Sequence, residues 1–419
     1  MIHQVKLPKL TLKRLTDVVY LQMWFLRYAS SRTTLDQKSC EDYFRKHPRF
    51  RGRHEQITKW LWSKKRVTKL NHLKEFAQGS PAEKRQWSRR LSREALGFLR
   101  EPVGSLIPHV ENIAQPWQEE GARFLRKFYQ DHLGSQTAKF PKFFFSEPES
   151  STFGRQEFLS EFEQINQLSI CPACDMESFS RIDHYFPKGL YPHLSCHPFN
   201  LVPICNTCNT DYKGETNLLQ RKRTGNPRKL EDMFLPYRGY GLRTETYLKI
   251  NLKKGVQLPI IIGLKPKPNQ SLCEKVEVCR DGFSIPDRWR QKSSQIQRSV
   301  YSQIQQVMQA NVASSSTQKA SLDIFAVRNV LDNLLFNLLD SQGRESSRFP
   351  MTWYLVALIN KEVEPAIDSS TPINLDNHEL LKDIADWLQQ EDGIPHPAHI
   401  SSPKIDKARN LRKIATEGK

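Results

Sequence analysis

The spacing of hydrophobic residues predicts helices near both ends of the chain. Close to the start, apolar residues at helical spacing are Leu12, Leu15, Val19, Met23 and Leu26. Far along the chain, the stretches IFAVRNVLDNLLFNLLD (324–340) and DNHELLKDIADWLQQ (376–390) repeat apolar residues every three or four positions. We expect each of these segments to form a helix that buries one face.

A further helix is predicted over SPAEKRQWSRRLSREALGFLR, residues 80–100. Ser80 and Glu83 have the spacing of a capping box, and Pro81 suits the first helical turn. One side carries the apolar residues Trp87, Leu91, Ala95 and Phe98. The other side carries the arginines Arg85, Arg89 and Arg93. We therefore expect an arginine stripe that faces solvent.

Strand signals are confined to the middle of the chain. RIDHY (181–185) is a short strand-like run stopped by Pro187, and YLKINL (247–252) and VQLPIIIGL (256–264) are the best later strands. KPKPNQS (265–271) breaks the pattern, and helical periodicity then resumes. These signals predict an α+β fold that is mostly helical.

Composition divides the chain into four predicted parts. Residues 1–135 form a basic helical region, and residues 136–156, rich in Gly, Ser and Pro, form a linker in which the FFF triplet has the character of a docking segment. Residues 157–240 hold a cysteine-bearing module. Residues 241–419 form a mixed and then largely helical region for packing or partner binding, whose basic end (403–419) we expect to be frayed.

The charge of the chain is concentrated near its start. Net charge is +18, and residues 1–100 hold 24 Lys and Arg against 8 Asp and Glu, a balance of +16. A nucleic acid fits this surface better than a membrane, because no lipidation signal accompanies it. Lys64, Lys65 and Arg66 lie beside Trp60 and Trp62, which suits phosphate contact and base stacking. The alternatives are core tryptophans and a basic face that only keeps the protein soluble.

The apolar runs and the cysteines indicate the compartment. The longest apolar run, VVYLQMWFL (18–26), has nine residues, whereas a membrane span needs about 20. Of eight cysteines, four form two CxxC pairs and four are scattered. In a large chain this pattern indicates metal binding in a reducing compartment, so we expect a cytoplasmic protein.

The two CxxC pairs predict a structural zinc site. Cys171 and Cys174 form the first pair and Cys205 and Cys208 the second, with 30 residues between the pairs. Four thiolates close a tetrahedral zinc site and leave no open position for a substrate. Any catalysis must then come from another centre.

The residues between and after the cysteine pairs supply a candidate for that centre. Asp183 and Asn209 offer the hard oxygen ligands that suit Mg²⁺ or Mn²⁺, and His184 suits a general base near neutral pH. If a helix begins near the second pair, Asn209 and Lys213 share one face, and Lys213 is then a candidate phosphate contact.

The order CxxC, Asp-His, NLVPxCxxCNxxxK resembles the HNH endonuclease family over about 45 of 419 residues. The resemblance implies a ββα-metal finger that hydrolyses phosphodiester bonds around one divalent cation. It implies that His184 is the general base, that Asn200 holds the hairpin loop, and that Asp183 and Asn209 bind the metal. The run IDHYFPKGLYPHLSCHPFNLVPICNTCNTDYKG (182–214), followed by FLPYRGYG (234–241), is similar to HNH nucleases of retrons and ATPase partners in prokaryotic anti-phage defence.

Two other functions compete with DNA cleavage. A zinc-ribbon protein can bind nucleic acid without cutting it, but such a module needs only its cysteines, whereas here the Asp-His pair and both asparagines are present. An HNH-type nuclease can also act on RNA, and the motif allows this. The sequence favours a metal-dependent nuclease acting on DNA.

Overall fold

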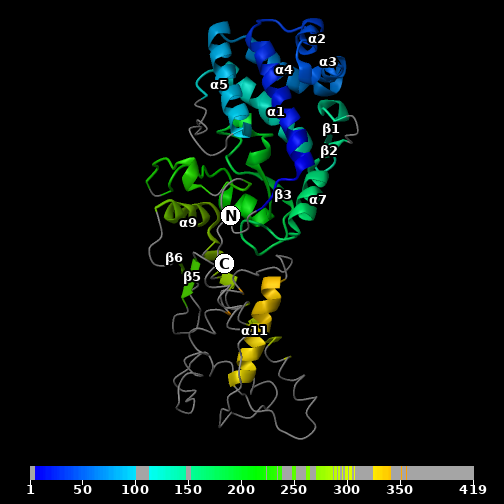
Figure 1. Cartoon of the computed structure of the whole chain (residues 1–419). Coiled ribbons are helices and arrows are strands. Elements are labelled where there is room, and N and C mark those ends of the chain that lie inside the picture. Colours follow the sequence, from blue (N-terminus) through cyan, green and yellow to red (C-terminus); the bar gives the residue numbers. More distant parts are fainter. Residues whose placement is uncertain are drawn as a thin grey trace.

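A computed structural model describes residues 5–100, 113–147, 152–222, 224–233 and 235–237. Further along it describes residues 248–251, 261–264, 270–285, 287–289 and 324–340, with isolated helical residues between 291 and 355. Helices dominate, as the sequence predicts, and the early ones gather at one end of the molecule (Figure 1). These helices are α1 (Lys9–Ser30), α2 (Gln37–Arg45), α3 (His54–Leu61), α4 (Val67–Ala77), α5 (Pro81–Arg100) and α6 (Pro116–Phe128).

Helices α1 and α5 confirm the two early helix predictions. In α1 the residues Leu15, Val19, Met23 and Leu26 are buried. In α5 the buried residues are Trp87, Leu91, Ala95 and Phe98. α1 packs against α5 and α4 packs against α6, so each apolar face meets another helix. The three arginines of the predicted stripe are exposed on the opposite face of α5.

The two tryptophans of the basic segment belong to the core. Trp60 is buried and packs against Phe128 and Phe144, at ring centroid distances of 5.7 and 4.8 Å. Trp62 is partly buried against the same core. Burial of such large rings removes much apolar surface from water. We therefore assign both tryptophans to the core and not to base stacking.

The prediction of a linker over residues 136–156 requires correction. Strand β1 (Lys139–Phe140) pairs antiparallel with β2 (Phe153–Gly154). The phenylalanines of this segment that are buried are Phe140, Phe144, Phe145 and Phe153. Aromatic burial therefore outweighs the Gly, Ser and Pro content, and the described residues of this segment are part of the core. The docking expected of the FFF triplet holds for Phe144 and Phe145.

The predicted cysteine-bearing module, residues 157–240, opens within α7 (Arg155–Asn166). Strand β3 (Arg181–His184) pairs antiparallel with β4 (Leu201–Ile204), and η7 (Cys208–Lys213), a π-helical turn, follows. Between the strands, the short 3₁₀ helices η5 (Pro192–Leu194) and η6 (Pro198–Asn200) contact α5, and η5 also contacts α6. One hydrophobic cluster includes buried residues of both the module and the helical region. The two therefore share a core in the described part of the chain.

The later elements match the predicted strands and one predicted helix. Strands β5 (Leu248–Asn251) and β6 (Ile261–Leu264) form an antiparallel hairpin. Helix α9 (Gln270–Phe283) follows, and α11 (Ile324–Asp340) has the bounds that its periodicity predicts. The predicted helix at 376–390 and the basic end at 403–419 lie outside the described residues.

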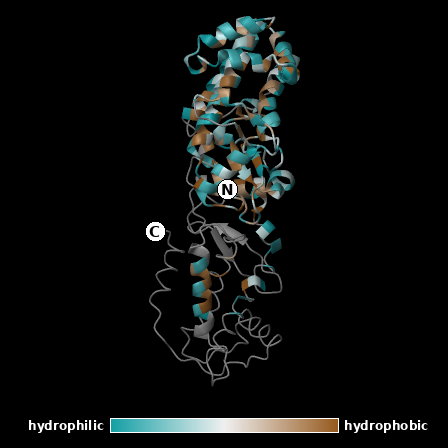
Figure 2. Cartoon of the chain, turned by 90° about the vertical axis from the view of Figure 1, so that its right-hand side faces the viewer, coloured by the Kyte–Doolittle hydropathy of each residue, from teal (hydrophilic) through white to brown (hydrophobic). Residues whose placement is uncertain are grey.

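Among the described residues, no helix has the length and the apolar character that crossing a lipid bilayer requires. Figure 2 shows hydrophilic and hydrophobic residues interspersed along the helices.

Candidate functional site

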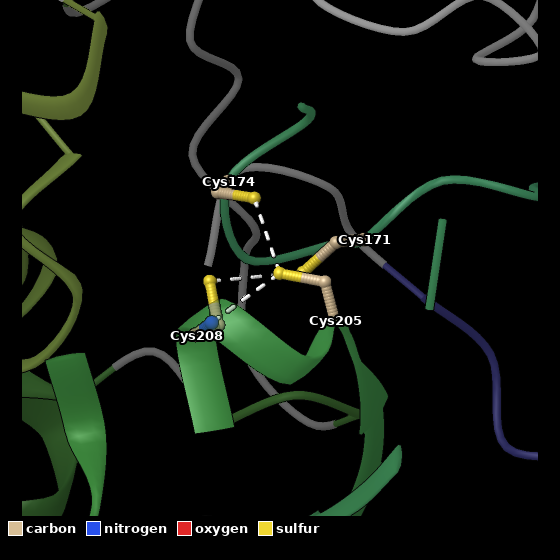
Figure 3. Close-up of side chains that lie close together, drawn as sticks. All are labelled: Cys171, Cys174, Cys205 and Cys208. Carbon is tan, nitrogen blue, oxygen red and sulfur yellow. Dashed lines mark hydrogen bonds between the residues drawn. The ribbon is translucent and has the colours of Figure 1, made fainter. Parts of the chain in front are cut away.

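The four paired cysteines come together as the sequence predicts. Cys171 and Cys174 lie in the turn before β3, Cys205 follows β4, and Cys208 begins η7 (Figure 3). All four are buried, and their sulfur atoms lie within 4.8 Å of one another. The Sγ atoms of Cys171 and Cys208 are 3.9 Å apart, and those of Cys174 and Cys205 are 3.8 Å apart. Tetrahedral zinc with bonds of about 2.3 Å needs sulfur separations of about 3.8 Å. The cluster therefore suits a structural zinc ion.

Two residues far along the chain support this cluster. The guanidinium of Arg288 donates to Cys208 Sγ at 2.7 Å and to Glu177 at 3.0 Å. The indole of Trp289 donates to the carbonyl oxygen of Cys174 at 3.1 Å. Arg288 and Trp289 are both buried, and the positive charge of Arg288 offsets thiolate charge. Sequence reasoning missed both residues, because no local pattern marks a partner 80 residues from Cys208.

His184 ends β3, and its imidazole is fixed by a backbone carbonyl. His184 Nε2 lies 2.9 Å from the carbonyl oxygen of Ser195. A carbonyl only accepts, so Nε2 carries the proton of the neutral ring and Nδ1 is the nitrogen that can accept another. Burial lowers the pKa of His184 well below 6.5, and the positive charge of Lys188 acts in the same direction. The ring is therefore neutral at physiological pH, as a general base must be.

The end of α6 also positions His184. The ring of Tyr129 packs edge-on against the imidazole at a centroid distance of 4.1 Å, and its hydroxyl donates to the carbonyl oxygen of Ile182 at 2.6 Å. Ser195 Oγ donates to the carbonyl oxygen of Leu125 at 3.0 Å. Sequence reasoning missed Tyr129 and Ser195, which connect the cysteine-bearing module to the helical region.

Asn200 closes the loop between the two strands. Its side-chain oxygen accepts from the amide of Phe186 at 2.6 Å, and its side-chain nitrogen donates to the carbonyls of Phe186 and Leu194, both at 3.0 Å. Asn200 is fully buried. These are the contacts of a residue that holds a hairpin loop.

Asp183 and Lys213 form a buried ion pair beside His184. Lys213 Nζ lies 3.2 Å from Oδ1 and 3.1 Å from Oδ2 of Asp183, and it donates to the carbonyl oxygen of His184 at 2.6 Å. Burial raises the pKa of Asp183, and the positive charge of Lys213 opposes that shift. The prediction that Lys213 contacts nucleic acid requires correction, because its side chain is 1% exposed and its ammonium is turned into the protein.

Asn209 and Lys213 both lie in η7, where the sequence predicts a helix. The Asn209 side chain is half-buried, and its amide group makes no hydrogen bond to the residues that the structure describes. Asp183 Oδ2 is buried, and among the described residues its polar contact is the ion pair with Lys213 Nζ at 3.1 Å. Carboxylate and amide oxygens are the kinds of donor that suit a hard divalent cation.

The histidines of the loop before Asn200 contact α5. His193 Nε2 lies 3.2 Å from a carboxylate oxygen of Glu94, and His197 Nε2 lies 3.1 Å from the carbonyl oxygen of Ala95. Both histidines are fully buried, so they have a structural role. Cys196 in the same loop is also buried.

The predicted nucleic-acid contacts lie on the helical region. Arg85, Arg89 and Arg93 are exposed on α5, and Lys64 and Lys65 are exposed in η2, a 3₁₀ helix at Lys64–Arg66. Arg66, the last residue of η2, is partly buried. Its guanidinium carbon lies 5.3 Å from the centroid of the Trp60 ring.

Comparison with known proteins adds little to this picture. No protein-family model matches the chain, and no solved structure matches it. A stretch of 46 residues, 11% of this chain, is 46% identical to Protein ea31 of Escherichia phage lambda. The stretch covers 16% of that phage protein, whose name states no activity.

Proposed function

We propose that this protein is a metal-dependent endonuclease of the HNH type that hydrolyses phosphodiester bonds, with DNA as the preferred substrate. The observation that carries the proposal is the setting of His184: a neutral imidazole with Nε2 fixed by the Ser195 carbonyl, adjacent to the buried carboxylate of Asp183. A module that only binds nucleic acid has no need of this arrangement. Asn200 and the four-cysteine cluster hold the surrounding backbone in place.

The proposed reaction assigns a role to each side chain. His184 Nδ1 takes the proton of the attacking water, because Nε2 already donates its proton to Ser195. Asp183 and Asn209 would hold Mg²⁺ or Mn²⁺ through their side-chain oxygens. A divalent ion bound there supplies positive charge for the phosphate and for the departing 3′ oxygen.

The basic helical region supports nucleic acid as the substrate. The arginines on α5 are exposed on the helix that also receives His193 and His197 of the finger. Phosphate binding along this helix would place a duplex next to the finger. Burial of Trp60 leaves base stacking there without support, which favours double-stranded DNA over single strands.

The experiment is incubation of the purified protein with supercoiled DNA, linear DNA and RNA in Mg²⁺ and in Mn²⁺. We expect DNA cleavage that EDTA abolishes and that His184→Ala lowers by roughly 10²–10⁴-fold. His72→Ala, in α4 and outside the finger, is the matched control. Cleavage that survives His184→Ala would remove the assigned base, and binding without cleavage would favour the zinc-ribbon alternative.

An ATPase partner that restrains cleavage is a further prediction of the sequence resemblance. A nuclease with such a basic surface would damage the DNA of its own cell if it were always active. Robust plasmid cleavage by the purified protein alone would contradict the prediction that a partner restrains cleavage.

A further inference from the structure

The ammonium of Lys213 is surrounded by oxygen atoms. Besides the two carboxylate oxygens of Asp183 at 3.2 and 3.1 Å, it meets the carbonyl oxygens of His184 at 2.6 Å and Gly214 at 3.4 Å. The side chains of Lys213 and Asp183 are 1% and 5% exposed. Carboxylate and carbonyl oxygens are also the donors that a hard divalent cation requires.

The buried carboxylate explains why a cation lies here. An ionised carboxylate without a partner is strongly destabilising in a protein interior. Lys213 supplies the compensating charge through both carboxylate oxygens of Asp183. A divalent cation bound to the same carboxylate would also compensate its negative charge.

The two cations conflict if they occupy the carboxylate together. A divalent ion about 2.1 Å from an Asp183 oxygen would lie within roughly 4–5 Å of the ammonium. At that separation a charge of +2 and a charge of +1 repel each other, even at the effective dielectric constant of a protein surface. Withdrawal of Lys213 relieves this repulsion.

We propose that Lys213 is a built-in cation that occupies Asp183 in the metal-free protein and that the divalent ion must displace. This inference rests on the proposed function, because it concerns the same metal site. Competition with Lys213 would make divalent-ion binding weaker than the oxygen ligands alone would allow. Binding of the ion would also require the Lys213 side chain, in η7, to move.

The first test measures Mn²⁺ binding by electron paramagnetic resonance at pH 8, with zinc retained. We expect Lys213→Met to bind Mn²⁺ at least about tenfold more tightly than the wild type, because the competing charge is gone. Lys188→Met removes the same charge from a lysine that pairs with Glu215, and we expect a much smaller change. Asp183→Asn should abolish binding. Unchanged or weaker Mn²⁺ binding by Lys213→Met would overturn the proposal.

The second test uses the wild-type protein and so does not depend on the folding of a variant. Reductive methylation followed by peptide mass spectrometry reports the exposure of each lysine. The buried Lys213 should react slowly without divalent ions and several-fold faster with saturating Mn²⁺, whereas the buried Lys69, paired with Asp131, should not change. Equal labelling of Lys213 with and without bound Mn²⁺ would overturn the proposal.

Thermal unfolding supplies a third readout. Without divalent ions, Lys213→Met should unfold about 10 °C below the wild type, because a buried carboxylate has lost its partner. Mn²⁺ should recover most of this loss. A loss that Mn²⁺ does not recover would contradict the exchange of one cation for the other. None of these readouts needs cleavage, so a protein that cuts nothing can still confirm the exchange, and an active nuclease can still refute it.

Discussion

At the scale of single residues, His184 is held by groups from distant parts of the chain. The Ser195 carbonyl fixes its Nε2, the Tyr129 ring packs against it, and Lys213 donates to its backbone carbonyl. Burial by these neighbours disfavours the charged imidazolium. The reference pKa of a free histidine, which the sequence alone suggests, is therefore too high for this residue.

The first prediction concerns the pH dependence of cleavage. A general base works in its neutral form, which exists above its pKa, and burial lowers the pKa of His184 well below 6.5. We expect cleavage to persist as pH falls through 6.5 and to decline only at more acidic pH. The measurement is kcat/KM against pH at saturating Mg²⁺.

Residual cleavage by His184→Ala serves as the control and should lack this acidic decline. A decline of wild-type activity centred at or above 6.5 would show that the imidazole is not desolvated as the structure indicates.

At the scale of elements, α5 has two distinct faces. Its apolar face packs into the core and its backbone and Glu94 contact the cysteine-bearing module, while Arg85, Arg89 and Arg93 are exposed to solvent. Because a helix is rigid over these turns, the arginines have a defined position relative to His184.

The second prediction concerns this arginine stripe. Replacing Arg85, Arg89 and Arg93 together by glutamine should weaken DNA binding by roughly tenfold or more. The slope of log K against log salt concentration should fall by the amount that about three phosphate contacts contribute. The midpoint of thermal unfolding should hardly change, because all three side chains are exposed. Fluorescence anisotropy at several salt concentrations measures both effects.

The matched control removes equal charge from another exposed surface, with glutamine at Lys38, Lys46 and Arg51. Equal losses of affinity in the two triple variants would mean that only net charge attracts DNA and that α5 has no special role.

At the scale of the whole molecule, the four-cysteine cluster joins parts of the chain that are far apart in sequence. Arg288 and Trp289 bind its thiolate and its backbone, and an ion pair at 2.6 Å joins Arg228 to Asp281 at the end of α9. Helix α9 also packs against η7, the turn that begins at Cys208. Loss of a zinc ion held by these cysteines should therefore loosen the later region as well as the cysteine-bearing module.

The third prediction tests this connection. Arg288→Met should lose zinc to a chromogenic chelator roughly 10–100-fold more readily than the wild type, because outer-shell donors stabilise bound thiolates to that extent. Arg280→Met removes an arginine of α9 that pairs with Glu277 at the surface, and it should retain zinc normally. Equal zinc loss in both variants would show that Arg288 only packs.

Much of the fold was predictable because the relevant signals are local. Helical spacing of apolar residues located α1, α5 and α11, and the two β-rich runs located β5 and β6. CxxC spacing was enough to identify the four-cysteine cluster. The linker prediction was wrong for the described residues of 136–156, because Gly, Ser and Pro content carries no information about whether nearby phenylalanines find a core.

The sequence by itself determined which residue types are available: four paired thiols, one Asp-His pair and an arginine face on one helix. Only the tertiary structure decided that Lys213 turns inward to Asp183, that Ser195 orients His184, and that Arg288 reaches Cys208. The reason is physical. Helix faces and metal-ligand spacings follow from the geometry of a few consecutive residues, whereas burial and partner choice depend on packing of the whole chain.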